Sequence, residues 1–453
     1  MIPRVDPKRR AVVGALLVLA ASAVHASGLR SQAPGPRVVR VGADRPVGPG
    51  SSHPEVEPHL SINPRKPSHL LAASMTVLTS DAATIDCTIF VSFDGGVGWS
   101  SATLRSLGYR AAGGCGDPWT AILPDGTALV SVLGDSGTVV VFRSADGGRT
   151  WSETRSVIRG GHDHEMMLAD TVGGAVYLVS GAGSRNTRGE PRYAVFIARS
   201  GDGGRTFIER GRHVFSNLNY EAQTPVVLSD GTLVISYMDH RLPGGARLER
   251  RRVWVATSQD AGLTVTEPML VSEACNRQGP AAWPTFAVAP PATEHADRLY
   301  FACEAHQNRG VVFARSADRG SRWTIAARAD SVGAGAPMSD SAWTKVPALA
   351  VSASGAVALT WYDRRDDPRR QCQHLYATVS LDGGASFLPA ARISEAPSCP
   401  DAGTNGGAAA RFPGGGDYSG LVAVGPREFL AVWSDSRSGR FQLRVARFTV
   451  TDR

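Results

Sequence analysis

The stretch SADGGRTW, residues 144–151, is one of six closely related segments of the chain. The other five are SFDGGVGW from Ser92, SGDGGRTF from Ser200, SQDAGLTV from Ser258, SADRGSRW from Ser316 and SLDGGASF from Ser380. Successive segments start 52, 56, 58, 58 and 64 residues apart. A period of this length is too long for helical solenoid repeats and indicates one supersecondary unit per repeat.

The residues around each segment predict the structure of that unit. In the ranges 221–262 and 345–387, three short apolar runs are separated by DG or SG turn signals, and a fourth run follows the repeated segment. This pattern predicts a four-stranded antiparallel meander in which the segment forms the turn between the third and fourth strands. Such a sheet has two apolar faces, so copies must stack around an axis. The sequence therefore predicts an all-β protein, a single β-propeller.

In the repeated segment each residue type has a structural use. The Asp accepts backbone N–H groups in the turn, the second Gly tolerates positive φ, and the aromatic residue packs between neighbouring sheets.

Counting first strands gives seven blades, although only six carry the segment. The expected first strands start near Glu57, Asp117, Asp163, Glu221, Trp283, Lys345 and Asp417. The last unit has only three strands, and we expect the N-terminal PRVVRVG, residues 36–42, to supply its fourth, which leaves no open edge. The predicted organisation is an extended segment over 27–54 that contributes this strand, followed by the propeller over 55–453, with every repeated turn on one end.

The N-terminus predicts export. Residues 1–26 combine a basic start, an apolar run and small residues around Ala26, which is the pattern of a cleavable secretory signal. The run is shorter than the roughly 20 residues that span a bilayer. We therefore expect a secreted or periplasmic protein without a membrane span. The remaining chain is mildly basic and has no long run of like charge, which argues against a nucleic-acid partner.

The six cysteines form an even set, as expected for disulfides in an exported chain. Partners 27 or 28 positions apart fall near the end of the propeller opposite the repeated turns. The predicted pairs are Cys87–Cys115, Cys275–Cys303 and Cys372–Cys399. No cysteine or histidine spacing indicates a zinc site, and we expect no metal and no cofactor.

The end opposite the repeated turns collects the loops that enter first strands and leave second strands. We expect it to form a polar, mixed-charge mouth that includes Asp117 and Asp163 as substrate-binding candidates. Three D-x-R motifs end at Arg241, Arg365 and Arg437, and a recurring salt bridge is the favoured interpretation of this repetition. Arg364 lies outside the motif and is a ligand candidate for that reason.

The motif S-x-D-x-G-x-x-W resembles the Asp-box, or bacterial neuraminidase repeat, and the chain from about residue 55 resembles the sialidase superfamily of secreted β-propellers. That resemblance implies three arginines that clamp a substrate carboxylate, a tyrosine nucleophile activated by a glutamate, and an aspartate acid/base. DYSGL, residues 417–421, is similar to the nucleophile segment. The implied catalytic candidates are Tyr418, Glu221, Asp86 and Asp81, and the resemblance implies Arg241 as one clamp arginine. Arg364 and Arg437 are further substrate-binding candidates at the mouth.

Three features depart from the family pattern. Glu57 stands where an arginine is expected, Arg241 lies beyond the usual spacing, and sialidases have six blades. Two classes of function therefore stay open: a secreted, sialidase-like glycoside hydrolase of the exo-α-sialidase type, and a non-catalytic propeller that binds glycans or proteins. The hydrolase predicts a carbohydrate ligand, and so does a propeller that binds glycans. We expect a monomer.

Overall fold

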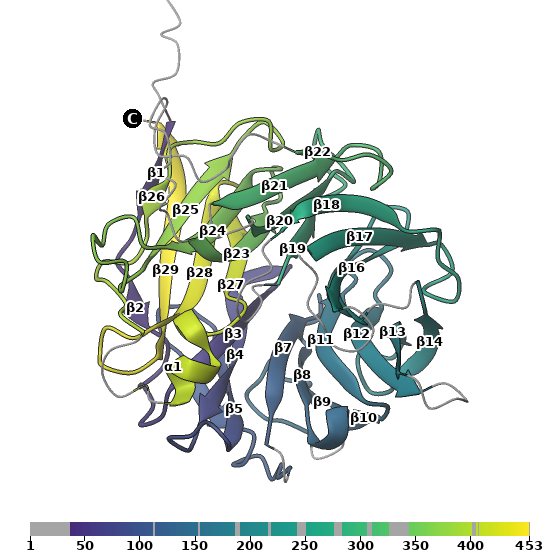
Figure 1. Ribbon diagram of the computed structural model, residues 1–453, viewed down its shortest axis with the longest axis horizontal. Coiled ribbons are helices and arrows are strands. Elements are labelled where there is room, and N and C mark those ends of the chain that lie inside the picture. Colours follow the sequence, from purple (N-terminus) through teal and green to yellow (C-terminus); the bar gives the residue numbers. More distant parts are fainter. Residues whose placement is uncertain are drawn as a thin grey trace, which may run out of the picture.

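A computed structural model of the chain describes residues 37–111, 114–152, 155–185, 191–215, 219–241, 251–275, 283–305, 310–325, 344–400, 405 and 407–452. The strands form seven antiparallel sheets arranged in a ring (Figure 1), so the predicted seven-bladed propeller is confirmed.

Blades 1 to 4 each contain four strands that follow one another in sequence. Blade 1 is β3 (Glu55–Asn63), β4 (Lys66–Val77), β5 (Ile85–Ser92) and β6 (Ser100–Thr103); blade 2 is β7 (Gly116–Ile122), β8 (Ala128–Leu133), β9 (Val139–Ser144) and β10 (Ser156–Ile158). Blade 3 is β11 (His162–Ala169), β12 (Val176–Arg185), β13 (Pro191–Ser200) and β14 (Ile208–His213); blade 4 is β15 (Asn219–Val227), β16 (Leu233–Arg241), β17 (Arg251–Ser258) and β18 (Met269–Cys275).

Blades 5 and 6 repeat this order, and blade 7 closes the ring. Blade 5 is β19 (Thr285–Val288), β20 (Leu299–Glu304), β21 (Val311–Ser316) and β22 (Thr324–Ile325); blade 6 is β23 (Thr344–Val351), β24 (Val357–Asp363), β25 (His374–Ser380) and β26 (Ala391–Arg392). Blade 7 contains β27 (Gly420–Gly425), β28 (Glu428–Asp435), β29 (Gln442–Asp452), β1 (Arg37–Val41) and the short β2 (Arg45–Pro46).

The N-terminal strand closes the propeller as the sequence predicted. β1 runs antiparallel to β29, with Arg37 opposite Asp452 and Val41 opposite Phe448, and β2 pairs with the beginning of β29. The two ends of the described chain are thus joined in one sheet, and the last blade gains the outer strand that its own sequence lacks.

The core consists of apolar layers between neighbouring blades. One layer packs Phe142 of blade 2 against Ile89 and Val91 of blade 1, and another packs Trp361 of blade 6 against Phe313 of blade 5. The middle strands are covered on both faces, and for this reason their sequences are nearly continuous apolar runs such as TIFVS in β5.

The six repeated turns have one hydrogen-bonding scheme. In the turn that starts at Ser144, the serine Oγ donates to Asp146 Oδ1 over 2.7 Å, and the backbone N–H of Gly148 donates to the same Oγ over 2.6 Å. Gly148 has φ of +98°, which explains the glycine at this position. The Ser–Asp contact recurs in all six turns, each directly after the third strand of its blade.

Arginines connect several of these turns to a neighbouring blade. Arg143 of blade 2 donates to the Gly203 carbonyl of blade 3 over 2.9 Å, and Arg447 of blade 7 donates to the Gly95 carbonyl of blade 1 over 2.8 Å. The second contact crosses the junction where the ring closes.

All three predicted disulfides are present: Cys87–Cys115, Cys275–Cys303 and Cys372–Cys399. Disulfides of this kind are typical of proteins that fold in an oxidising compartment. The described part of the chain contains no helix with the length and hydropathy needed to cross a membrane. The expected signal, residues 1–26, lies outside the described residues.

Candidate active site at the mouth of the propeller

The innermost strands of four blades begin with an irregular turn of backbone. β3, β7, β11 and β23 each show a register shift near their first residues, and each carries a non-glycine residue at positive φ there: Glu57 (54°), Asp117 (45°), His164 (51°) and Val346 (55°). This conformation costs about 1–3 kcal/mol per residue, and such strain clusters at functional sites. The repetition around the axis marks the mouth as a specialised region.

A cleft with a volume of about 390 Å³ opens at this mouth. Four carboxyl groups line it, together with a tryptophan, a histidine and one arginine: Glu57, Asp117, Asp163, Asp417, Trp283, His164 and Arg411. The carboxyl groups come from blades 1, 2, 3 and 7, so the ring of blades brings together residues up to 360 positions apart.

One wall of the cleft is the connection between blades 6 and 7, which carries α1 (Gly407–Arg411) and the short helix η3 (Pro413–Gly415). Arg411 donates to the Ala82 carbonyl over 2.6 Å, which fixes this wall to blade 1. Gly416 has φ of +113°, and a Cβ there would lie 2.1 Å from the Glu57 side chain. Glycine therefore allows the backbone N–H of Asp417 to donate to Glu57 Oε1 over 3.3 Å.

Desolvation and mutual repulsion raise the pKa values of these carboxyl groups. Burial and the neighbouring Asp163 raise the pKa of Asp117 to about 7. Burial, Asp117 and Glu304 raise the pKa of Asp417 to about 8, against the opposing effect of Lys345 and Arg251. The pKa of Glu57 also rises well above its usual value, through burial and then through Asp417 and Asp117. Asp163 keeps an exposed side chain, but partial desolvation by the cleft walls still raises its pKa.

Tyr418 lies beside the cleft, where the sequence placed it. Its side chain is buried, its ring is 5.6 Å from that of Trp119 and 6.0 Å from that of His164, and its hydroxyl has no hydrogen-bond partner among the described residues. Burial raises the pKa of Tyr418 well above 10, and the charges of Glu57, Asp117, Glu165 and Asp417 raise it further. The phenol is therefore protonated at neutral pH.

A second pocket, lined by aromatic rings, adjoins the cleft at Trp283. This narrower pocket of about 100 Å³ is lined by Trp119, Trp283, Tyr418 and Ser419, and the Ser419 hydroxyl, like that of Tyr418, has no partner among the described residues. His164 packs 4.1 Å from Trp283, and burial lowers its pKa to about 3, so its ring is neutral. Unpaired buried polar atoms of this kind are normally satisfied by water or ligand.

The remaining catalytic candidates do not line the cleft. Glu221 is buried on the innermost strand β15. Asp86, at the start of β5, accepts the N–H of Cys87 over 2.9 Å and lies 3.9 Å from Arg105 Nε. Asp81 is exposed in a turn and accepts from the Thr79 hydroxyl and the Ala83 N–H.

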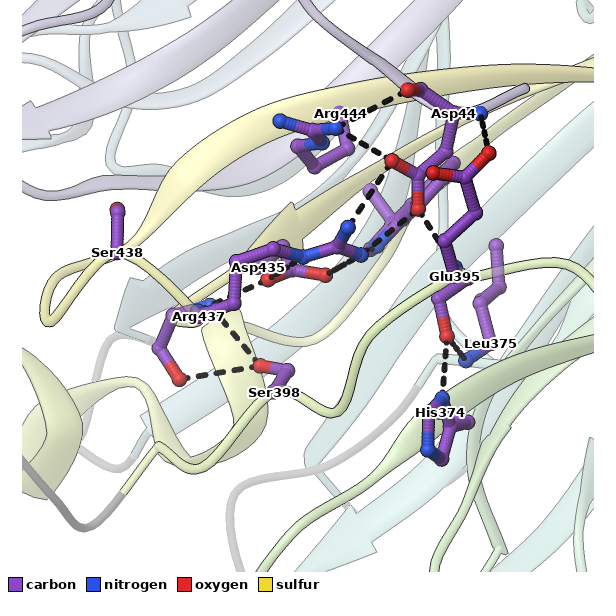
Figure 2. Close-up of polar contacts among 12 residues, drawn as sticks. Asp44, His374, Leu375, Glu395, Ser398, Asp435, Arg437, Ser438 and Arg444 are labelled. Carbon is purple, nitrogen blue, oxygen red and sulfur yellow. Dashed lines mark hydrogen bonds and ion pairs between the residues drawn. The ribbon is translucent and has the colours of Figure 1, made fainter.

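The arginine candidates have other positions. Arg241 ends β16, and its side chain lies outside the described residues. Arg364 lies in the turn after β24 and donates to the Arg370 carbonyl over 2.6 Å. Arg437 is paired with Asp435 over 2.7 Å and with Asp44 over 2.8 Å, on the outer part of blade 7 (Figure 2).

Two of the three D-x-R motifs form the expected salt bridges. Asp435 pairs with Arg437 and Asp363 pairs with Arg365, and each aspartate also accepts from a tryptophan two residues earlier. In the third motif, Asp239 accepts from Arg252 over 2.9 Å and from Trp254 over 3.1 Å. The motif therefore ends the second strand with a clamp.

The predicted site residues did not include several that line the site, among them Asp417, Arg411 and Trp119. Trp119 lies two positions after Asp117. Its nearness in sequence to a residue expected at the mouth could have identified it as a site residue. Arg411 had no comparable signal, because its position depends on how α1 packs against blade 1. Within the described residues, no group of three or more His, Cys, Asp or Glu side chains is arranged to hold a metal ion.

No known family model matches the chain, and no curated protein matches it in sequence. Solved structures do resemble it. They include a protein of unknown function from Dyadobacter fermentans (TM-score 0.48, 14% identity, 91% of this chain and 99% of that one) and Hadza microbial sialidase Hz136 (0.47, 14%, 82% and 74%). An α-L-arabinofuranosidase from Fusarium graminearum with an iminosugar inhibitor has a TM-score of 0.43 at 14% identity, over 75% of this chain and 93% of that one.

Proposed function

We propose that the protein is a glycoside hydrolase whose reaction centre is the acidic cleft, and that its substrate is a neutral glycan. The observation that carries the proposal is the gathering of four carboxyl groups with raised pKa values in one cleft. Asp117 and Asp417, with pKa values of about 7 and 8, retain protons near neutrality. Neighbouring carboxyl groups that share a site resist ionising together, so one can keep its proton as the acid while another ionises as the base of glycoside hydrolysis.

In this proposal Asp417 is the general acid that protonates the leaving oxygen, because its raised pKa suits an acid working near pH 7. Asp163 is the carboxylate that activates water or stabilises positive charge at the sugar, since its side chain is the most exposed of the four carboxyl groups in the cleft. The Asp417 N–H bond to Glu57 and the close approach at Gly416 hold the acid in place.

The size and walls of the cleft suit a sugar. Its volume of about 390 Å³ lies within the range of small-molecule sites, roughly 300–1,000 Å³. Trp283 in the cleft and Trp119 and Tyr418 beneath it offer apolar ring faces, and the neutral His164 offers a hydrogen-bonding edge to sugar hydroxyls.

The charge of the cleft favours a neutral substrate over a sialoside. Four carboxyl groups and one guanidinium, that of Arg411, line it. A substrate carboxylate would meet a single guanidinium there, whereas a sialidase clamp presents several arginine forks to such a group. Of the expected clamp residues, Arg364 and Arg437 have partners away from the cleft.

Tyr418 has a supporting role in this proposal. The four carboxyl groups that raise its pKa oppose formation of a phenolate, so it acts as a hydrogen-bond donor to the substrate. A nucleophilic Tyr418, as the family resemblance implies, would need one of these carboxylates to remove its proton during the reaction.

The test measures hydrolysis of nitrophenyl glycosides of neutral sugars and of sialic acid by the purified chain. We expect turnover of a neutral glycoside, a loss of at least about 100-fold in kcat for Asp417→Asn, and a much smaller loss for Tyr418→Phe. The matched control is Asp230→Asn, which removes an exposed carboxylate on blade 4. Full activity of Asp417→Asn would overturn the assignment of the acid, and a larger loss for Tyr418→Phe would favour a tyrosine nucleophile. Glycan binding without turnover, unchanged in both variants, would favour the non-catalytic propeller.

We also propose that the chain is exported. The three disulfides and the signal pattern of residues 1–26 support this together. N-terminal sequencing of the mature protein tests it, and a start before residue 26 would contradict it.

A further inference from the structure

A second depression lies on the outer part of blade 7. It has a volume of about 550 Å³ and is formed by the connection between β28 and β29, the beginning of β29, and the chain near β2. Three arginines and one aspartate are its ionisable lining residues: Arg437, Arg440, Arg444 and Asp435. We call this depression the arginine groove.

The arginine groove presents positive charge to solvent. The side chains of Asp44 and Asp435 are 0% exposed, whereas those of Arg437 and Arg444 above them are 18% and 21% exposed. Figure 2 shows both guanidinium groups converging on Asp44. The carboxylates are therefore covered, and a ligand that enters the groove meets guanidinium groups.

Two arginines keep hydrogen-bond donors that no protein carboxylate uses. Arg440 donates from Nη1 to the Ser52 carbonyl over 2.7 Å and forms no ion pair within the described part of the chain. Arg444 binds Asp44 through Nη2; its Nε has no hydrogen-bond partner among the described residues but is buried, so the donors open to a ligand are those of Arg440. Guanidinium forks with spare donors match the oxygens of carboxylate and sulfate groups.

The groove lies on the same end of the propeller as the acidic cleft, because β28 ends there and β27 begins there. The segment that includes α1 and η3 separates the two. At one end of it, Asn405 Oδ1 accepts the N–H of Phe441 next to the groove, and at the other end Asp417 contacts Glu57 in the cleft. The two depressions thus differ on one face: carboxyl groups dominate the cleft and arginines dominate the groove.

We propose that the arginine groove is a second ligand site that binds an acidic group, a carboxylate or a sulfate, carried by a glycan. That the acidic group belongs to a glycan rests on the proposed function; the preference for an oxyanion rests on the groove alone. A glycan with an acidic unit would then bind this face through the groove, while a neutral unit would suit the cleft.

The experiment titrates glucuronate, inorganic sulfate and glucose into the full chain and measures binding by calorimetry. We expect glucuronate to bind and glucose not to bind at the same concentrations. Arg440→Gln should weaken glucuronate binding about tenfold, the equivalent of one charge-assisted hydrogen bond. Arg319→Gln is the matched control: it removes an exposed arginine of blade 5 that pairs with Asp230, and it should change nothing.

Further variants separate the possible outcomes. Arg440→Lys keeps the charge without the fork, so binding intermediate between the wild type and Arg440→Gln supports guanidinium recognition. Asp417→Asn should leave glucuronate binding unchanged, because it alters only the cleft; failure of the hydrolase proposal would therefore leave this result intact. Loss of glucuronate binding in Asp417→Asn would overturn the assignment of the binding site to the arginine groove. Equal glucuronate binding by the wild type and Arg440→Gln would also overturn it. Binding of sulfate without glucuronate would support a sulfated unit as the ligand, whereas binding of neither would overturn the proposal.

Discussion

Replacement of Asp417 by asparagine should stabilise the fold at alkaline pH while it removes activity. The pKa of Asp417 is about 8 in the folded chain, raised by burial, Asp117 and Glu304, and its ordinary value is 3.8. Between these pH values the folded state holds a proton that the unfolded state has released. The free energy of unfolding therefore falls as pH rises from about 4 to about 8. Asparagine resembles the protonated acid and cannot ionise, so Asp417→Asn avoids this loss.

The size of the effect follows from the pKa difference. About four pKa units at 1.36 kcal/mol each give an upper bound on the order of 5 kcal/mol at pH 8. Near the melting temperature, unfolding entropy is about 2.1 cal/mol/K per residue, so for a folded region of about 400 residues this bound corresponds to roughly 5 °C in Tm. At pH 4 the expected gain is close to zero, because the wild-type carboxyl group is then protonated in the folded state.

Urea unfolding followed by tryptophan fluorescence, at pH 4 and at pH 8, measures the difference. Asp230→Asn is the matched control, because its carboxylate is exposed and paired with an exposed arginine. The reasoning would be refuted if Asp417→Asn were equally stabilised at both pH values, or less stable than the wild type at pH 8.

Three further changes test the structural framework by urea unfolding. Asp44→Asn should destabilise the chain by about 3–5 kcal/mol, because it leaves covered guanidinium groups without their carboxylate; Asp230→Asn should cost less than about 1 kcal/mol, and equal costs would contradict the importance of burial. Removal of the Cys372–Cys399 bridge by a double serine variant should cost about 3–4 kcal/mol for its 27-residue separation, and an unchanged midpoint would contradict this. Arg447→Ala should cost about 1–2 kcal/mol through the lost contact across the ring junction; no change would mean that this contact does not contribute to closure.

The fold followed from the sequence because its determinants are local. Each repeated turn is made by residues two to four positions apart, such as Ser144, Asp146 and Gly148, so the pattern could be counted without coordinates. The closing strand and the disulfides then followed from blade geometry, since β1 fills the single place that the repeat left open.

The site was predictable only where a residue starts an innermost strand. Tyr418 and Asp117 were placed at the mouth for that reason, and the structure puts both there. Arg437 was considered as a ligand of that mouth, but its pairing with Asp44, 393 positions away, is a tertiary contact that sequence patterns do not show. The positive φ of Glu57 recurs at Asp117, His164 and Val346, and the strand patterns in the sequence did not predict it.

The pH dependence of kcat/KM tests the proposed reaction centre most directly. Rates on the best neutral glycoside are measured from about pH 4 to pH 10 for the wild type and for Asp417→Asn. We predict a wild-type rate that falls above pH 8, as the proton of Asp417 is lost, and a variant that lacks this fall because its residual rate does not depend on that proton. A wild-type rate that stays constant to pH 10, or a purified chain that hydrolyses no neutral glycoside at any pH, would contradict catalysis by the acidic cleft.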